Sequence, residues 1–517
     1  MTTAPQLSLS PNALSTLTGM ERGIEKEGLR FTPQGHIAQS DHPRALGSTL
    51  THPWITTDYS EALLEFITPK LHSIEHSLTW LDELHAFTQR HLGNEQIWPA
   101  SMPCRLKGPS SIPIAQYGSS NIGIMKHVYR RGLEVRYGRT MQAIAGIHYN
   151  ISLPDEFWSA YQNDLGRSGD VDAFRSDQYF HLIRNFHRHS WVLYYLFGAS
   201  PVLDQSFFGD RTPNLDRYGD TTWGLPFATS LRMSDLGYTN SAQQDLHIGY
   251  DSIGDYIRTL SHAVHQPYPA YEALGVKDKA GEYQQLNANI LQIENEYYSE
   301  IRPKRVAHTG ERPVQALRRG GVEYIEVRAP DINPFLRAGI DRTVCRFIDA
   351  FALYCLLTHS AQQCPNDWAE IAENRKQVIK YGRQPGLELT YCDQTKTVQD
   401  WVKHLLTGIA QAAELLDQAY STDAYSKAVT AQHIKASDPD QTPSGQVMSK
   451  IKEGTEFIDL IQSLSSNHTK SLQELSITDA RLAEFEAATE RSLAEQSQRE
   501  LDDDMSFDQY LADYNKL

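Results

Sequence analysis

The sequence predicts an α+β fold, in which strands and helices follow one another without regular alternation. Strand-like segments, in which apolar and polar side chains alternate, occur within residues 23–70 and over residues 148–153 and 322–328. Residues 74–92 instead carry apolar side chains at helical spacing. Because these segments form no repeating strand–helix–strand unit, a doubly wound parallel sheet is not expected.

Helices dominate the later part of the chain. We expect helices over residues 174–196 and 341–357, and after about residue 360 the sequence is rich in helix-forming and polar residues. We therefore predict a catalytic core over residues 1–360 and a mostly helical C-terminal region over residues 361–517 that packs on it, with one single domain as the alternative. Residues 437–444, with the sequence SDPDQTPS, are rich in turn-forming residues and are the best candidate for a loop or linker.

The composition is that of a folded protein with a sizeable core. Hydrophobic residues make up 40% of the 517 residues and charged residues 22%, which excludes disordered, collagen-like and coiled-coil proteins. The formal net charge of −16 disfavours nucleic acid or an anionic membrane as a partner, because both require a basic surface. We expect small-molecule substrates and a monomer.

The sequence also predicts a cytoplasmic location. Residues 1–17 lack the basic patch and apolar run of a secretory signal. The longest apolar stretch, residues 191–203, is shorter than the about 20 residues that span a bilayer, so we expect it to be buried core. The five cysteines are far apart and form no CxxC pair, which fits reduced thiols. Pairing of Cys364 with Cys392 under oxidation is a hypothesis, and two free thiols are the alternative.

Acidic side chains recur on the predicted N-terminal strands. In GIEKEGLR, residues 23–30, a strand places Glu25 and Glu27 on one face and the intervening Lys26 on the other. Glu65 lies inside an otherwise apolar strand-like run, with Asp58 at the preceding turn. An acid in such a run needs a partner.

Two later strands add an imidazole and another acid. In residues 148–153 His148 lies on the polar face, and in residues 322–328 Glu326 and Arg328 share one face. Each segment alone is typical of a half-exposed antiparallel strand with one wet face. Their recurrence favours a functional interpretation, because few lysines share these faces to neutralise the acids.

If these faces converge, the acids require cations to stay ionised. Carboxylates with one imidazole suit Mg²⁺ or Mn²⁺ better than zinc or copper. Neither a GxxxxGK[ST] phosphate loop nor a GxGxxG fingerprint occurs, so any nucleotide is bound in another way.

Six segments together resemble the proteobacterial type of glutamate-cysteine ligase, and they occur in order between Gly23 and Phe335. They are GIEKEGLR (23–30), WITTDYSEALLEFITP (54–69), GIHYNISLP (146–154), SLRMSDLGY (230–238), IRPKR (301–305) and VEYIEVR (322–328). The sequence departs from the commonest form of the first motif at Lys26 and Gly28, whose positions face away from the carboxylates. The region after about residue 360 carries no such motif.

The resemblance implies a glutamine-synthetase-like catalytic core, with a curved, mainly antiparallel sheet and surrounding helices. It also implies six metal ligands, which are Glu25, Glu27, Asp58, Glu65, His148 and Glu326. Arg130 and Arg328 are expected to steady the transferred phosphoryl group, and Arg232 to meet the glutamate substrate. The residues that it implies for the cysteine pocket are Tyr129, Tyr238 and Tyr298.

The function implied by the resemblance is the ATP-dependent ligation of glutamate to cysteine, the first step of glutathione biosynthesis, with Mg²⁺ or Mn²⁺ as the metal. The reaction passes through γ-glutamyl phosphate and needs no nucleophilic side chain, which agrees with the absence of a Ser-His or Cys-His signature. The alternatives are a related ATP-dependent ligase that uses a different amine and a binding or scaffold protein in which the acids hold structural ions.

Overall fold

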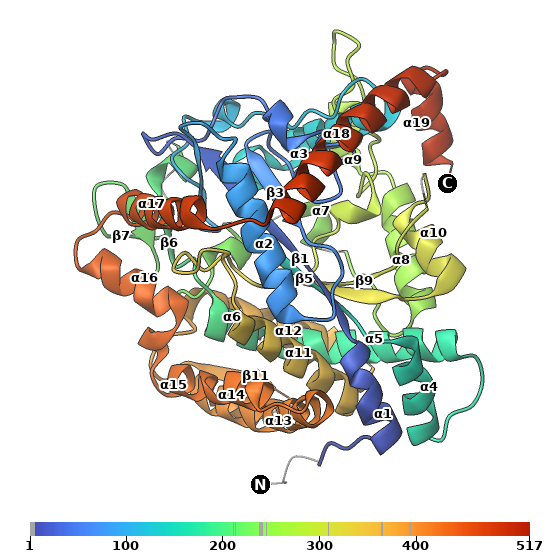
Figure 1. Cartoon of the computed structure of the whole chain (residues 1–517), viewed down its shortest axis with the longest axis vertical. Helices are drawn as coiled ribbons and strands as arrows, with labels where there is room; N and C mark the ends of the chain where they lie inside the picture. Colours follow the sequence, from blue (N-terminus) through green and yellow to red (C-terminus); the bar gives the residue numbers. More distant parts are fainter. Residues whose placement is uncertain are drawn as a thin grey trace.

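A seven-stranded sheet lies at the centre of the chain and helices surround it (Figure 1). The computed structural model describes residues 6–209, 211, 213–236, 241–244, 246–308, 310–362, 365–391 and 394–516. Tyr238, Cys364 and Cys392 lie outside these residues, so the predicted roles of all three stay predictions.

Every pairing between strands of the central sheet is antiparallel. The strands are β1 (Glu21–Phe31), β2 (Ile55–Thr57), β3 (Leu63–Ile67), β4 (Gln96–Ile97), β5 (Ile147–Ser152), β9 (Ile301–Lys304) and β10 (Tyr324–Val327). Their order is β2-β3-β1-β5-β10-β9, and β4 pairs with β1 outside this path. The predicted α+β class with an antiparallel sheet is confirmed.

The register of the sheet collects the acidic side chains on one face. Glu25 pairs with His148 on β5, and Glu27 pairs with Glu65 on β3. Glu326 on β10 pairs with Asn150. Since side chains on paired positions of neighbouring strands lie on the same face, the faces predicted from the sequence are confirmed.

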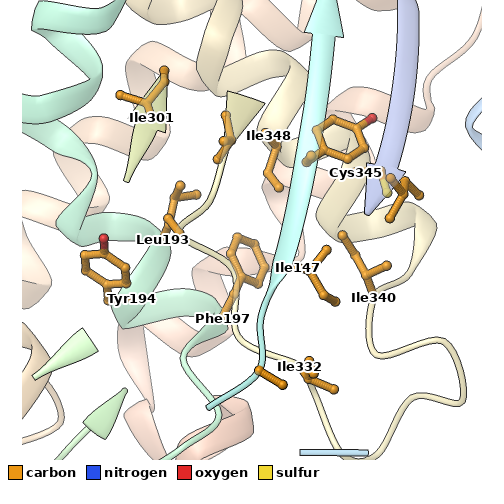
Figure 2. Packing of buried hydrophobic residues seen from close by; sticks show 14 of the residues in the cluster. Ile147, Leu193, Tyr194, Phe197, Ile301, Ile332, Ile340, Cys345 and Ile348 are labelled. Atoms are coloured by element: carbon orange, nitrogen blue, oxygen red, sulfur yellow. The ribbon is translucent and has the colours of Figure 1, made fainter. Parts of the chain in front are cut away.

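The opposite face of the sheet is apolar. Helix α2 (Ile74–Gln89) packs against β1 and β3, and side chains of α6 (Trp191–Phe197) and α11 (Arg342–Leu357) belong to the same buried core. Figure 2 shows side chains of the strands, such as Ile147, packing between those of α6 and α11. All residues of α6 are buried, as expected for core. The Lys26 side chain also lies on this face, with its ammonium nitrogen 5.8 Å from the centre of the Phe66 ring.

The remaining described elements form the outer layers. The helices are α1 (Pro11–Thr16), α3 (Asn121–Tyr137), α4 (Asp155–Asp164), α5 (Val171–His189), α7 (Ser241–Gln244), α8 (Ile253–His265), α9 (Pro269–Leu274), α10 (Pro313–Gly320), α12 (Pro365–Tyr381), α13 (Val398–Tyr420), α14 (Ala424–Thr430), α15 (Gln432–Ser437), α16 (Pro443–Lys452), α17 (Phe457–Glu474), α18 (Asp479–Asp502) and α19 (Phe507–Asn515). The other strands are β6 (Val202–Asp204), β7 (Asp216–Arg217), β8 (Thr222–Gly224), β11 (Glu388–Tyr391) and β12 (Gln394–Thr397).

The late helices return to the N-terminal half of the chain. Helix α17 packs against α2 and β4, and α19 packs against α3 (Figure 1). Residues 437–444 form a short connection that ends at α16, and the Ser444 amide donates a hydrogen bond to the Gly198 carbonyl. The division of the chain at residue 360 stays a prediction. In the described part of the chain, no helix is both long and apolar enough to cross a bilayer.

The helical stretch predicted over residues 174–196 is confirmed except at Ser190, where the chain bends and α5 gives way to α6. The Ser190 hydroxyl donates a hydrogen bond of 2.8 Å to the buried Glu300 carboxylate, and Tyr194 donates one of 2.5 Å to the same group. The bend therefore accompanies a polar contact that spacing along the helix cannot reveal. The helices predicted over residues 74–92 and 341–357 are confirmed as α2 and α11.

A buried ion pair ties β1 to α11 beneath the sheet. Arg22 donates hydrogen bonds of 2.9 and 2.8 Å to Asp349, and the Tyr149 hydroxyl donates one of 3.1 Å to the same carboxylate. The Arg22 and Asp349 side chains are 1% and 0% exposed. The guanidinium charge consequently has little access to water once its partner is removed.

We expect Asp349→Asn to lower the free energy of unfolding by about 3 kcal/mol, because it leaves the buried Arg22 without a counter-charge. Urea-induced unfolding measures this loss. The control is Asp82→Asn, which breaks the Arg337–Asp82 pair, whose side chains are 29% and 22% exposed. Partly exposed pairs are worth about 1 kcal/mol or less, so equal losses in the two variants would contradict the expectation.

Candidate active site

The predicted metal ligands on β1, β3, β5 and β10 come together around His148. Its Nδ1 lies 3.0 Å from Glu25 and 3.8 Å from Glu326, and its Nε2 lies 3.6 Å from Glu27. Ligand atoms of Glu25, Glu65 and His148 all lie within 4.8 Å of one another, which is the spacing of a metal site. Asn150 donates a hydrogen bond of 2.9 Å to Glu25 and helps to orient it.

Two of the acids have no partner of opposite charge among the residues that the structure describes. Among the described residues, none forms a hydrogen bond or an ion pair with the carboxylate of Glu65 or Asp58. Burial raises the pKa of Glu65 well above its ordinary value of 4.5, and the charges of Glu25, Asp58 and Glu27 raise it further. Burial also raises the pKa of Glu27. These residues fit a divalent cation, which would offset the repulsion.

The β10 end of the same face is basic. Glu326 lies 3.3 Å from Lys304, 3.3 Å from Arg328 and 3.9 Å from Arg302. Burial alone would raise the pKa of Glu326, but Lys304 and Arg328 outweigh it and hold this pKa well below the ordinary value. Glu326 therefore stays ionised between the acidic cluster and three cations. Such a polarity suits metal ions on one side and phosphate oxygens on the other.

A cavity of about 710 Å³ opens beside this face. It brings together five of the predicted site residues, which are Asp58, Tyr129, Arg130, Tyr298 and Arg328. Arg130 and Tyr129 come from α3, whose N-terminus is capped by the Ser120 hydroxyl. The Arg130 guanidinium lies 4.6 Å from the centre of the Tyr117 ring and donates a hydrogen bond to the Asp58 carbonyl, so it is held in place.

Arg232 lies under the segment that follows β10. Its guanidinium donates hydrogen bonds of 3.1 to 3.3 Å to the carbonyls of residues 328–330 and lies 3.5 Å from Asp331. It contacts Gly146 so closely that a Cβ on that glycine would lie 2.1 Å from it. Arg232 does not line the cavity. Its predicted contact with glutamate stays a prediction.

The sequence analysis missed part of the cavity wall. Helix α12 contributes Trp368, Ala369, Ile371, Ala372 and Arg375, and the segment before β9 contributes Glu300. Glu300 is buried beside His187 and Arg375, and its pKa falls to about 2 because the charge of Arg375 and hydrogen bonds with His187 and Tyr194 overcome the opposing effect of burial. The spacing of Trp368, Ile371 and Arg375 along one helical face was the available signal, but it does not distinguish a cavity wall from a surface helix.

The chain is similar to known enzymes along almost its whole length. A family model described as Glutamate-cysteine ligase matches residues 7–378. A glutamate–cysteine ligase from Hahella chejuensis is 48% identical over 503 residues, which are 96% of this chain and 96% of that protein. One from Pseudomonas aeruginosa is 49% identical over 502 residues, 97% of this chain and 95% of that protein.

Solved structures agree with these sequence relationships. The crystal structure of glutamate–cysteine ligase from Francisella tularensis in complex with AMP matches with a TM-score of 0.91 and 36% identity, over 96% of this chain and 97% of that one. A bifunctional glutathione synthetase from Pasteurella multocida shares the fold, with a TM-score of 0.73, 24% identity, and coverage of 92% of this chain and 57% of that one. Together with the family match over residues 7–378, these similarities show that the chain belongs to the glutamate-cysteine ligase family.

Proposed function

We propose that this ligase joins the γ-carboxylate of L-glutamate to the amine of L-cysteine through γ-glutamyl phosphate, with ATP as the phosphate donor and ADP and phosphate as products. The observation that carries the proposal is the sheet face on which unpartnered acids lie beside Glu326 and Arg328, at the edge of the cavity. The Francisella tularensis relative was solved with AMP, which supports a nucleotide site in this fold.

The proposed metal is Mg²⁺, with Mn²⁺ as the alternative. The proposed ligands are Glu25, Glu27, Asp58, Glu65, His148 and Glu326. The donor set supports this choice, because it consists of five carboxylates and one imidazole, and hard divalent cations prefer oxygen. Cations bound there would offset the charge on the phosphate oxygens of ATP.

The residues of the chain position the substrates and stabilise charge. Arg130 and Arg328 approach the cavity from α3 and from the end of β10, where they can hold the transferred phosphoryl group between them. We propose that Arg232 meets glutamate and that the cysteine pocket uses Tyr129, Tyr238 and Tyr298. The cysteine amine then attacks the acyl phosphate, phosphate leaves, and the amine proton passes to solvent or to the departing phosphate.

The test of this function is ADP release with ATP, Mg²⁺, glutamate and cysteine, leaving out one component at a time. We expect full turnover only when all four are present. If ammonia or another amino acid replaces cysteine without loss, the chain is the related ligase with a different amine. Metal binding without any ATP turnover would favour the scaffold protein. We also propose that the protein is cytoplasmic and monomeric. Gel filtration tests the second point, because a monomer should elute near 58.5 kDa.

The Mg²⁺-induced rise in melting temperature is expected to increase with pH. In the metal-free protein the raised pKa of Glu65 means that the folded state binds more protons than the unfolded chain, so this group's contribution to stability falls as pH rises from 4.5 through the folded pKa. A divalent cation bound at the acidic cluster offsets this loss of stability. Thermal melts at about pH 5 and about pH 8, with and without Mg²⁺, measure the effect.

The control for the pH series is Glu65→Gln, which cannot ionise. Its Mg²⁺-induced rise should depend less on pH than that of the wild type, because one of the two acids of this cluster with a raised pKa, Glu65 and Glu27, is gone. A Mg²⁺ effect that is the same at both pH values in the wild type would contradict the proposed role of Glu65.

A further inference from the structure

We propose that Arg375, on α12, binds the α-carboxylate of the incoming amino acid and thereby selects an amino acid over a simple amine. The inference rests on the proposed function, because it assigns a residue to the amine substrate of that reaction. Arg375 lies outside every motif in which the chain resembles its family, and it lines the same cavity as Tyr129 and Tyr298.

Four arginines line the cavity, namely Arg130, Arg302, Arg328 and Arg375. Three of them already make close polar contacts. Arg130 donates to the carbonyls of residues 58 and 126. Arg302 donates to the carbonyls of residues 295 and 297. Arg328 lies 3.3 Å from both Glu326 and His148.

Arg375 differs from the other three because its donors remain available. In the described part of the chain its one polar contact is Glu300, at 3.6 Å, which is longer than a hydrogen bond. Its side chain is 40% exposed although it lines the cavity. An arginine in this state presents a planar guanidinium that can donate hydrogen bonds to both oxygens of a carboxylate.

Glu300 holds Arg375 in position without using its donors. Glu300 accepts hydrogen bonds from Ser190 at 2.8 Å and Tyr194 at 2.5 Å, and His187 lies 3.0 Å from it. Its two oxygens therefore have close partners already. The remaining charge attracts the guanidinium from 3.6 Å, and the helix fixes the backbone of Arg375.

The surroundings of Arg375 fit a small amino acid. Trp368 and Ala372 of α12 supply apolar wall, and Tyr297 and Tyr298 lie on the segment before β9. Tyr298 and Arg375 line the same cavity, so a ligand bound there can contact both side chains. A ligand held between Arg375 and Tyr298 would have its carboxylate at Arg375 and its amine free to point toward Arg328 and the acidic face of the sheet.

The experiment compares Arg375→Gln with Arg375→Lys, and uses cysteine and its decarboxylated analogue cysteamine as amines. Loss of a charge-assisted hydrogen bond should raise KM for cysteine by about 10-fold to 100-fold in Arg375→Gln. KM for glutamate and ATP should change by less than about 3-fold, a difference under 1 kcal/mol. KM for cysteine in Arg375→Lys should lie between those of the wild type and Arg375→Gln, because lysine keeps the charge but lacks the planar guanidinium.

The decisive quantity is the ratio of kcat/KM for cysteine to that for cysteamine. This ratio should fall about 10-fold or more in Arg375→Gln, because the variant loses only the contact that cysteamine cannot make. The matched control is Lys376→Gln on the same helix, since Lys376 is 58% exposed, pairs with Glu373 and does not line the cavity. Melting temperatures close to that of the wild type would show that the variants fold.

Equal losses for cysteine and cysteamine, or a rise in KM for glutamate as large as that for cysteine, would overturn the proposal. Failure of the proposed function would be seen separately, as a wild-type enzyme that does not need both glutamate and cysteine to release ADP. The ratio between the two amines reports on Arg375 alone.

Discussion

Glu326→Gln should lower kcat/KM on the order of 10³-fold while leaving the fold intact, because it removes a charge that lies between the proposed metal ligands and the arginine proposed to contact the phosphate. Glutamine keeps the shape of the side chain but is a poor ligand for a hard cation. Glu326 is buried, 3.8 Å from His148 and 3.3 Å from Arg328, so solvent cannot replace the lost carboxylate. Steady-state ADP release at several Mg²⁺ concentrations measures the loss.

The matched control for this change is Glu323→Gln, three residues earlier in the chain. Glu323 is 38% exposed and pairs with Arg305 at 3.8 Å, away from the acidic cluster. We expect near-native activity from it. If Glu326→Gln also turns over at a near-native rate at ordinary Mg²⁺, Glu326 is not a metal ligand.

Arg328→Gln should reduce kcat on the order of 10³-fold or more, the size of effect seen when an arginine that stabilises phosphoryl transfer is removed. Its guanidinium stands at the boundary between Glu326 and the cavity, and its charge is reinforced by Glu326 and Glu27, which raise its pKa despite burial. The loss should appear in kcat more than in the KM values of the amino acids. Arg328→Lys should recover a minor part of the lost kcat, because lysine keeps the positive charge but lacks the planar guanidinium that can make two parallel hydrogen bonds.

The control for Arg328 is Arg319→Gln on α10. Arg319 is 39% exposed, pairs with Glu311 and does not line the cavity. A melting curve is needed as well, because removal of Arg328 leaves Glu326 with Lys304 and Arg302 as its cations. A stable Arg328→Gln variant whose kcat is unchanged and whose KM for cysteine rises instead would place Arg328 in substrate binding.

The acidic face could be predicted from the sequence because strands have a period of two. Once Glu25 and Glu27 are placed on one face of β1, antiparallel pairing brings Glu65 and His148 beside them. The position of each acid relative to its neighbours in the same strand was sufficient for this inference. The place of β5 between β1 and β10 depends on contacts between segments more than 100 residues apart, and no local pattern reveals it.

The second wall of the cavity could not be predicted for the same reason. Arg375 becomes a cavity residue because α12 packs against α6 and lies near Glu300, which is 75 residues earlier in the chain. The bend at Ser190 likewise depends on Glu300, 110 residues away. Arg232 occurs in a recognisable motif, but its burial against the carbonyls after β10 is a tertiary contact.

The most direct test of the central claim is the anomalous diffraction of crystals grown with Mn²⁺ and ATP. The account predicts Mn²⁺ peaks on the acidic face of the sheet, within about 2.5 Å of carboxylate oxygens from Glu25, Glu65 and their neighbours around His148. Peaks at this position would identify the acids without a partner, such as Glu65, as metal ligands. Mn²⁺ bound elsewhere, with Glu65 and Asp58 still without a cation while ATP is present, would contradict the account.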